Sequence, residues 1–191
     1  MNTEELNALK DRAYKTAVAH GFHEEEKPDA FYLGLVMSEM GEAINADRKG
    51  LHADTKTFEV DLTILPFDFC FEEQIKDSVE DEIADIVIRL LDFAGMKGYT
   101  LLISGFSELP SNAIIETFAG NGLAGTLFHL TGVLSDSLDD NTTKATVGIV
   151  INILSDCFDK LTGGSDCDLW WFVKQKMRYN EQRPILNGKK Y

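Results

Sequence analysis

The chain has no run of about eighteen apolar residues, the length that a helix needs to span a bilayer. It also lacks the basic start and apolar stretch of a signal peptide, since the segment from Met1 to Glu5 includes two acids. Cysteine is scarce: Cys70, Cys157 and Cys167 are odd in number and show no metal-ligand spacing. We therefore expect a cytoplasmic protein that does not associate with a membrane.

Basic side chains are also in short supply, with 18 Lys and Arg against 32 Asp and Glu and a net charge of −14. A surface of this sign repels nucleic acid polymers and anionic membranes at long range. It would repel nucleotides as well, unless a divalent cation held by clustered carboxylates reversed the field locally. The acidity therefore argues against binding a nucleic acid but leaves room for a site that binds a metal and a nucleotide.

Strand patterns are few, and helical patterns dominate the chain. A length of 191 residues with 44% hydrophobic side chains suits a single globular domain over residues 1–191. Thr3 is a candidate cap for the first helix, and Gly21 a candidate stop. The expected helices cover about residues 3–21, 28–50, 71–98, 111–120, 122–138, 143–161 and 166–180. The sequence predicts an all-α helical bundle.

One segment does not fit the helical pattern. Val60, Leu62 and Ile64 alternate with polar or small residues, and Pro66 follows them. Alternation of this kind is typical of extended chain, and proline interrupts regular structure. We expect an irregular insertion at about 51–70.

Pairs of acids within apolar helices are the main candidates for chemistry. Glu39 and Glu42 are three residues apart, as are Glu82 and Asp85, so each pair lies on one face of its helix. Carboxylates in such apolar helices are costly to bury unless they are paired or bind a metal. Two facing helices can direct four carboxylates to one point, and hard oxygen ligands in this number suit Mg²⁺, with Mn²⁺ as a substitute.

Two alternatives to a magnesium site concern the same acids. Glu82, Asp85 and Arg89 could form a solvated stripe, which is the common arrangement for any one such pair. A ferritin-like di-iron site would require a histidine three residues after a glutamate, and the sequence has none. The histidines are scattered and receive no role: His20, His23, His52 and His129.

The motifs resemble a known family. The segments Ser38-Glu-Met-Gly-Glu-Ala-Ile-Asn-Ala-Asp-Arg-Lys-Gly and Val79-Glu-Asp-Glu-Ile-Ala-Asp-Ile-Val-Ile-Arg are similar to the Glu-x-x-Glu and Glu-x-x-Asp helices of the MazG-like all-α nucleoside triphosphate pyrophosphohydrolases. That superfamily includes dimeric dUTPases. The segment Lys176-Met-Arg-Tyr-Asn-Glu-Gln-Arg-Pro-Ile-Leu-Asn-Gly-Lys-Lys is similar to its Lys…Asn…Arg-Pro…Gly-Lys tail. The resemblance covers about residues 28–98 and 168–191.

Two features depart from the family pattern. Ser38 stands where the family often has a further acid, and the two acidic motifs are separated by a longer stretch than usual. The longer stretch contains the predicted insertion at 51–70. This insertion could form a lid or change which substrate is chosen, and the sequence leaves both options open.

The resemblance implies Mg²⁺-dependent hydrolysis of a nucleoside triphosphate between its α and β phosphates. It implies that the metal is held by the acids of both pairs, and that Glu39 or Glu42 acts as the base toward water. The substrate phosphates would meet the basic C-terminal segment at about 166–191, through Lys176, Asn180, Arg183 and Lys189. Lys176, Asn180 and Arg183 are four and then three residues apart, so they share one face if the helix continues to Arg183. The alternative for these cations is that they offset a helix dipole.

Other functions stay open at this point. The base and sugar of the substrate are undetermined, and dUTPase or dCTPase specificity is one option. A catalytically inactive module that binds a nucleotide or a metal, and a purely structural helical scaffold, are the alternatives to an enzyme. The resemblance also leaves open whether the protein forms a homodimer.

The chain also repeats itself weakly. Asp85-Ile-Val-Ile-Arg-Leu-Leu aligns without gaps with Gly148-Ile-Val-Ile-Asn-Ile-Leu, and Met40-Gly-Glu-Ala can be placed against Thr131-Gly-Val-Leu. This alignment suggests a degenerate second copy at 111–162 that kept its helices and lost the acids. Chance similarity between apolar helices is the alternative. A true duplication would let one chain supply the four-helix core that related enzymes assemble from two subunits.

Overall fold

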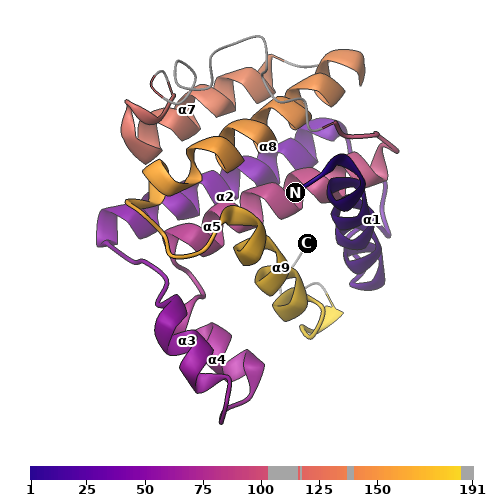
Figure 1. The fold of residues 1–191 in the computed structure, drawn as a ribbon. Helices are drawn as coiled ribbons and strands as arrows, with labels where there is room; N and C mark the ends of the chain where they lie inside the picture. The colour runs from indigo at the N-terminus through magenta and orange to yellow at the C-terminus, as the bar shows by residue number, and fades with distance from the viewer. Residues whose placement is uncertain (103–115, 117, 137–139, 186–191) are drawn as a thin grey trace.

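The computed structural model describes residues 1–102, 116, 118–136 and 140–185 (Figure 1). Over these residues the protein is helical and contains no strand, which confirms the predicted all-α class. No helix in the described ranges has the length and apolarity needed to cross a membrane. The helices are α1 (Thr3–Ala19), α2 (Asp29–Lys49), α3 (Thr55–Asp61), α4 (Phe67–Gln74), α5 (Val79–Met96), α7 (Gly122–Ser135), α8 (Asp140–Thr162) and α9 (Leu169–Asn180).

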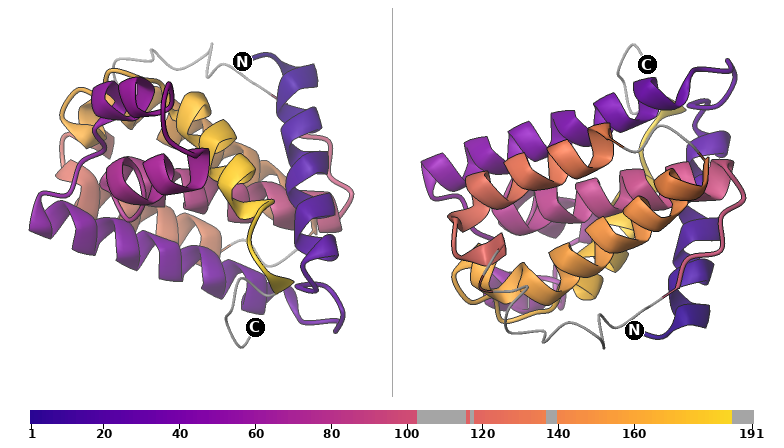
Figure 2. Two further views of the ribbon diagram at one scale, coloured as in Figure 1. Left: turned by 90° about the horizontal axis from the view of Figure 1, so that it is seen from below. Right: turned by 90° about the horizontal axis from the view of Figure 1, so that it is seen from above.

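Helix α5 is the central element of the fold. It contacts α1, α2, α8 and α9, while α7 packs on α2 and α8 (Figure 2). Nearly the whole length of α5 is buried, and the buried residues include the acids Glu80, Asp81, Glu82 and Asp92. The acidic side chains of α5 therefore point into protein, which is the first condition for a site.

The helix ends follow ordinary capping chemistry. Asn2, rather than the predicted Thr3, caps α1: its side chain accepts a hydrogen bond from the backbone of Glu5, and the Glu5 side chain returns one. Gly50 ends α2 in the left-handed conformation with φ of 66°, as its place after a lysine predicts. Asp168 caps α9 through the backbone N–H of Trp171.

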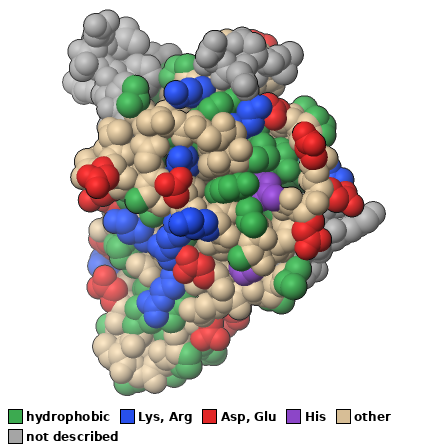
Figure 3. Space-filling view, turned by 90° about the vertical axis from the view of Figure 1, so that its right-hand side faces the viewer, with side chains coloured by type: hydrophobic (Ala, Val, Ile, Leu, Met, Phe, Trp, Pro, Cys, Tyr) green, Lys and Arg blue, Asp and Glu red, His purple; other side chains and the backbone are tan. Residues whose placement is uncertain are grey.

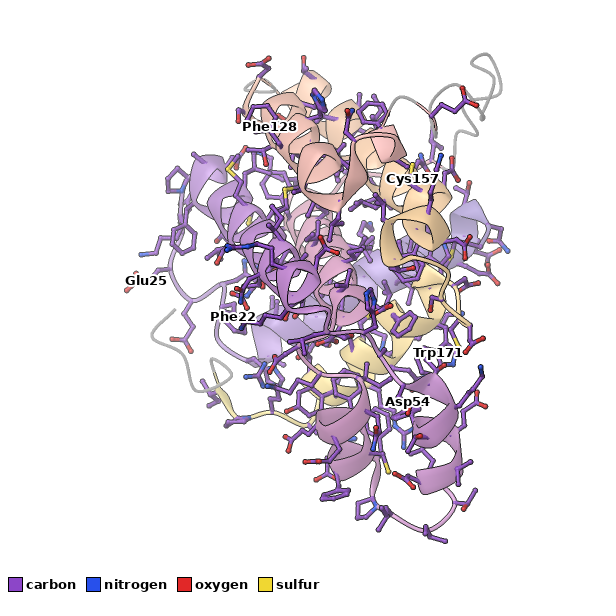
Figure 4. The ribbon with its side chains drawn as sticks, turned by 90° about the vertical axis from the view of Figure 1, so that its left-hand side faces the viewer. Phe22, Glu25, Asp54, Phe128, Cys157 and Trp171 are labelled. Atoms are coloured by element: carbon purple, nitrogen blue, oxygen red, sulfur yellow. The ribbon has the colours of Figure 1, made fainter. Side chains whose placement is uncertain are left out.

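The prediction of extended chain within 51–70 is wrong, because the segment contains the short helix α3 and the start of α4, with irregular chain before α3 and between the two helices. Val60 and Ile64 of the alternating pattern are 65% and 79% exposed, so the alternation does not mark a buried face. Phe58 is the buried aromatic residue of α3, and its ring meets that of Trp171 on α9 edge to face at 5.6 Å. Figure 4 labels Trp171 and, at the start of α3, Asp54. These two helices project from the bundle at one end (Figure 1).

The predicted helix at 71–98 is two helices. Helix α4 ends at Gln74, Asp77 adopts a left-handed φ of 62°, and Ser78 caps α5. Because Ile75 and Val79 on the two sides of the break are both buried, the apolar pattern runs through it and conceals it. The consequence is that Asp81 and Glu82 lie in the first turn of a helix rather than in its middle.

Helices α7 and α8 fall within the residues 111–162 of the suggested second copy. Leu130, which aligns with Glu39, is buried, and the Thr131 hydroxyl donates to the sulfur of Met40 on α2 at 3.3 Å. The predicted helix at 111–120 lies mostly outside the described residues, as does part of the connection before α8. The duplication itself stays a prediction.

Candidate functional site

The acids of α2 and α5 come together in space, as their spacing predicts. Glu39, Glu42 and Glu82 each offer a carboxylate oxygen within 4.8 Å of the others. Asp85 follows one turn after Glu82 and interacts electrostatically with both Glu39 and Glu82. Three of the predicted metal ligands therefore form one cluster, and the fourth lies beside it.

Burial separates these acids into two groups. Glu39 and Glu82 are each 4% exposed, whereas Asp85 is half-buried and Glu42 is exposed. A solvated stripe would leave Glu39 and Glu82 in water, so the structure disfavours that interpretation. The cluster is a buried carboxylate site that opens to solvent on the side of Glu42.

The buried carboxylates lack sufficient positive charge. One Glu39 oxygen accepts a hydrogen bond from Arg89 Nε at 3.0 Å, but Glu82 Oε2 has no hydrogen-bond partner among the described residues. Burial, reinforced by the charge of Asp85, raises the pKa of Glu82 to about 8. Burial also raises the pKa of Glu39, although Arg89 opposes the shift. Carboxylates in this state bind either a proton or a cation.

Lys176 does not lie where a substrate phosphate would reach it. It is 4% exposed, and its Nζ contacts Asp81 Oδ2 at 2.5 Å and Asp85 Oδ2 at 2.9 Å. Burial lowers the pKa of Lys176, but Asp81 and Asp85 outweigh this effect and raise it, so the side chain stays charged. The predicted phosphate ligand is, in this structure, an internal counter-ion for two acids of α5.

A pocket joins the acid cluster to the C-terminal segment. The pocket and its open mouth together contain ≈ 640 Å³ of space not filled by protein atoms, part of which is open solvent. Its walls come from α1, α2, α5 and the end of α9. They include Glu39, Asp85, Asn180 and Arg183, with Ala13, Thr16, Ala17, His20, Phe22, Ile88, Arg89, Asp92 and Met177.

The C-terminal residues reach this pocket in a different way from the one expected. Helix α9 ends at Asn180, so Lys176, Asn180 and Arg183 do not share one helix face. Instead, a turn in which the Arg183 N–H donates to the Asn180 carbonyl at 3.1 Å brings Arg183 to the pocket. Asn180 Oδ1 is buried there and has no partner in the described part of the chain. Lys189 lies outside the described residues.

Cationic side chains gather on part of the surface in spite of the net charge of −14. Figure 3, which views the molecule from its α1 side, shows Lys and Arg side chains grouped together among scattered acids. Arg12 of α1 forms a two-point ion pair with Glu181, at 2.6 and 2.9 Å, just after α9. This pair links α1 to the segment that carries Arg183.

Sequence reasoning missed a second buried pair at the pocket. His23 Nε2 lies 2.8 Å from Asp92 Oδ1, and both side chains are about nine-tenths buried. The His23 ring stacks on Tyr32 at 5.4 Å and meets Tyr14 edge to face at 5.1 Å. No local signal could have found the pair, because the two residues are 69 positions apart.

Arg89 also has a larger role than the sequence suggested. Its Nε donates to Glu39, and its guanidinium lies 5.7 Å from the ring centre of Phe22. It lines the pocket together with Asp92. The sequence indicates this role only through spacing, since Arg89 follows Asp85 by four positions on an apolar helix. The same spacing also fits the solvated stripe.

Scans against protein-family models, curated proteins and solved structures gave no match for this chain.

The raised pKa values predict how stability depends on pH. Between pH of about 5 and 8 the metal-free folded protein binds more protons than the unfolded chain, because Glu82 has a folded pKa of about 8 instead of 4.5. The stability that this proton contributes is complete below about pH 4.5 and is lost as the pH rises through 8. We expect the free energy of unfolding in EDTA to fall over this range, by up to about 1.4 kcal/mol per pH unit for each proton.

Urea unfolding of the wild type and of Glu82→Gln at several pH values checks this expectation. The substitution removes the titrating group but keeps its shape, so the variant should lose stability less steeply. Millimolar Mg²⁺ should restore wild-type stability above pH 7, because a cation binds the deprotonated site of the folded protein. Equal slopes for the two proteins, or a midpoint that Mg²⁺ leaves unchanged, would mean that Glu82 is not the group responsible.

Proposed function

We propose that this protein is a divalent-metal-dependent hydrolase that cleaves a nucleoside triphosphate between the α and β phosphates, releasing a nucleoside monophosphate and pyrophosphate. One observation carries the proposal: a single pocket is lined by the carboxylates Glu39, which is buried, and Asp85, which is half-buried, and also by Asn180 and Arg183, whose side chains can donate hydrogen bonds to phosphate. Carboxylates alone would suit a metal, and cations alone would suit an anion. Their juxtaposition suits a metal-bound polyphosphate.

The acid cluster fits a hard divalent cation. Glu39, Glu42 and Glu82 provide converging oxygens, and Glu82 Oε2 has no partner within the described chain. When bound, Mg²⁺ or Mn²⁺ would offset the negative charge of the triphosphate and favour deprotonation of water. Glu42 is exposed and can exchange protons with solvent, while Glu39 is hydrogen-bonded to Arg89. Either side chain can accept the proton of the attacking water, and Glu42 is the more accessible.

The remaining residues position the substrate and the acids. Arg183 and Asn180, which line the same pocket as Glu39 and Asp85, donate to the phosphate oxygens. Lys176 does not contact the substrate but positions a metal ligand, since its ion pairs with Asp81 and Asp85 hold Asp85 in place. Lys189 stays a predicted phosphate ligand, and the homodimer stays a prediction.

Arg183→Ala should raise KM for the nucleotide about 10- to 150-fold, because a charge-assisted hydrogen bond is worth about 1.5–3 kcal/mol. Steady-state kinetics at saturating Mg²⁺ measures this change. Lys15→Ala removes an exposed cation of α1 that does not line the pocket, so it should leave KM unchanged. If Arg183 only offsets the dipole at the end of α9, its removal would cost a few tenths of a kcal/mol in stability and would not alter KM.

The experiment that tests the proposed function is a pyrophosphate-release assay on a panel of nucleotides. The panel should contain the canonical ribo- and deoxyribonucleoside triphosphates, including dUTP and dCTP, and representative oxidised nucleotides. Pyrophosphate should appear with Mg²⁺ and not with EDTA for at least one of them. Calorimetry on the same nucleotides identifies the inactive alternative, in which the protein binds a nucleotide tightly and releases no pyrophosphate.

A further inference from the structure

A second cluster of carboxylates lies at the start of α5. Asp77, Asp81 and Glu82 each offer an oxygen within 4.8 Å of the others. Asp77 is exposed, whereas Asp81 and Glu82 are 1% and 4% exposed. The cluster therefore leads from the protein surface to the buried end of the helix, and it shares Glu82 with the cluster formed by Glu39 and Glu42.

Two buried oxygens in this cluster lack partners. Asp81 Oδ2 accepts hydrogen bonds from the Asp77 N–H at 3.0 Å and from Lys176 Nζ at 2.5 Å. Asp81 Oδ1 and Glu82 Oε2 are fully buried and have no hydrogen-bond partner within the described chain. Buried carboxylate oxygens are normally hydrogen-bonded or bound to a cation. We therefore expect Asp81 Oδ1 and Glu82 Oε2 to contact a ligand.

Groups already present do not supply it. Acids in the first turn of a helix are common because the helix dipole favours them. The dipole does not bond the two orphan oxygens, and the Asp81 N–H is directed to the Ser78 hydroxyl at 3.2 Å. Lys176 is shared between Asp81 and Asp85, and its charge lowers the pKa of Glu82 without a hydrogen bond to Glu82 Oε2. Lys76 donates to Asp77 Oδ2 at 2.8 Å and bonds neither orphan oxygen.

We propose that Asp77, Asp81 and Glu82 bind a second divalent cation of the Mg²⁺ and Mn²⁺ class, with Glu82 shared between this site and the Glu39–Glu42–Glu82 site. Hard carboxylate oxygens are the ligands that these ions select. The proposal concerns metal binding alone and does not depend on nucleotide hydrolysis.

The test counts Mn²⁺ ions bound to the full chain by electron paramagnetic resonance or calorimetry. The wild type should bind two ions, and Asp77→Asn should bind one. Asparagine tolerates the left-handed backbone of Asp77 and keeps its shape, so this variant should fold, as circular dichroism can verify. Asp68→Asn, at an exposed acid of α4, is the matched control and should bind two ions.

Glu42→Gln separates the two sites. This variant should keep the ion that depends on Asp77 and lose the other. The wild type could instead bind one ion that is lost in Asp77→Asn and retained in Glu42→Gln. This result would support the Asp77–Asp81–Glu82 site and would contradict the metal centre of the proposed function. Two ions of unchanged affinity in Asp77→Asn, or a single ion that depends only on Glu42, would overturn the proposal.

Discussion

Replacing Glu39 with glutamine should lower kcat for nucleoside triphosphate hydrolysis by on the order of 10²–10³-fold and leave the fold intact. The amide preserves the shape of the side chain and can still accept the hydrogen bond from Arg89 Nε, seen at 3.0 Å. It removes the negative charge that a metal ligand contributes, and that charge acts in a buried site where it is worth several kcal/mol in the transition state. Kinetics at saturating Mg²⁺ and substrate measure the loss.

Two further variants test whether the loss of kcat is specific to the acids of the site. Glu73→Gln, at an exposed acid of α4, changes the net charge by the same amount and should leave kcat unchanged. Asp85→Asn should also lower kcat strongly, although it removes a partner of Lys176 as well. Near-normal kcat in both Glu39→Gln and Asp85→Asn would remove these residues from the catalytic site.

Lys176→Met should destabilise the protein by about 3–5 kcal/mol, which is the usual consequence of removing one partner from a buried ion pair. Methionine matches the aliphatic length of lysine, so the effect reports the lost charge rather than a cavity. Without Lys176, Asp81 and Asp85 repel each other beside Glu82. Urea unfolding at pH 7.5 measures the change.

The pH dependence of that loss identifies its cause. Burial raises the pKa of Asp81 to about 6 even with Lys176 present, so Asp81 becomes protonated as the pH falls below this value. The difference between wild type and Lys176→Met should therefore shrink toward pH 5. Lys174→Met, two positions away on the exposed side of α9, should cost little at any pH. A loss for Lys176→Met below about 1 kcal/mol at pH 7.5 would contradict its role as a counter-ion.

The helices and the main acid cluster were predictable from local sequence. A three-residue spacing fixes Glu39 and Glu42 on one face, and the apolar residues around Glu82 indicate that its helix is buried. Packing α2 against α5 then brings the acids together. The short helices α3 and α4 were not predictable, because a few alternating residues cannot distinguish an exposed helix from extended chain.

Pairings between distant residues carried no sequence signal. Lys176 and Asp81 are 95 positions apart, and only the packing of α9 on α5 brings them into contact. The sequence pattern placed Lys176 among the phosphate ligands because it precedes Asn180 by one helical turn. The structure shows that the two side chains separate, since Lys176 enters the core while Asn180 lines the pocket.

Phosphorus NMR of the reaction products tests the central claim most directly. The preferred nucleoside triphosphate, incubated with the protein and Mg²⁺, should give nucleoside monophosphate and pyrophosphate in equal amounts. The same sample with Glu39→Gln should form both products more slowly, by on the order of 10²–10³-fold. Release of orthophosphate and a nucleoside diphosphate would contradict cleavage between the α and β phosphates, and an unchanged spectrum for every nucleotide tested would contradict an enzymatic role.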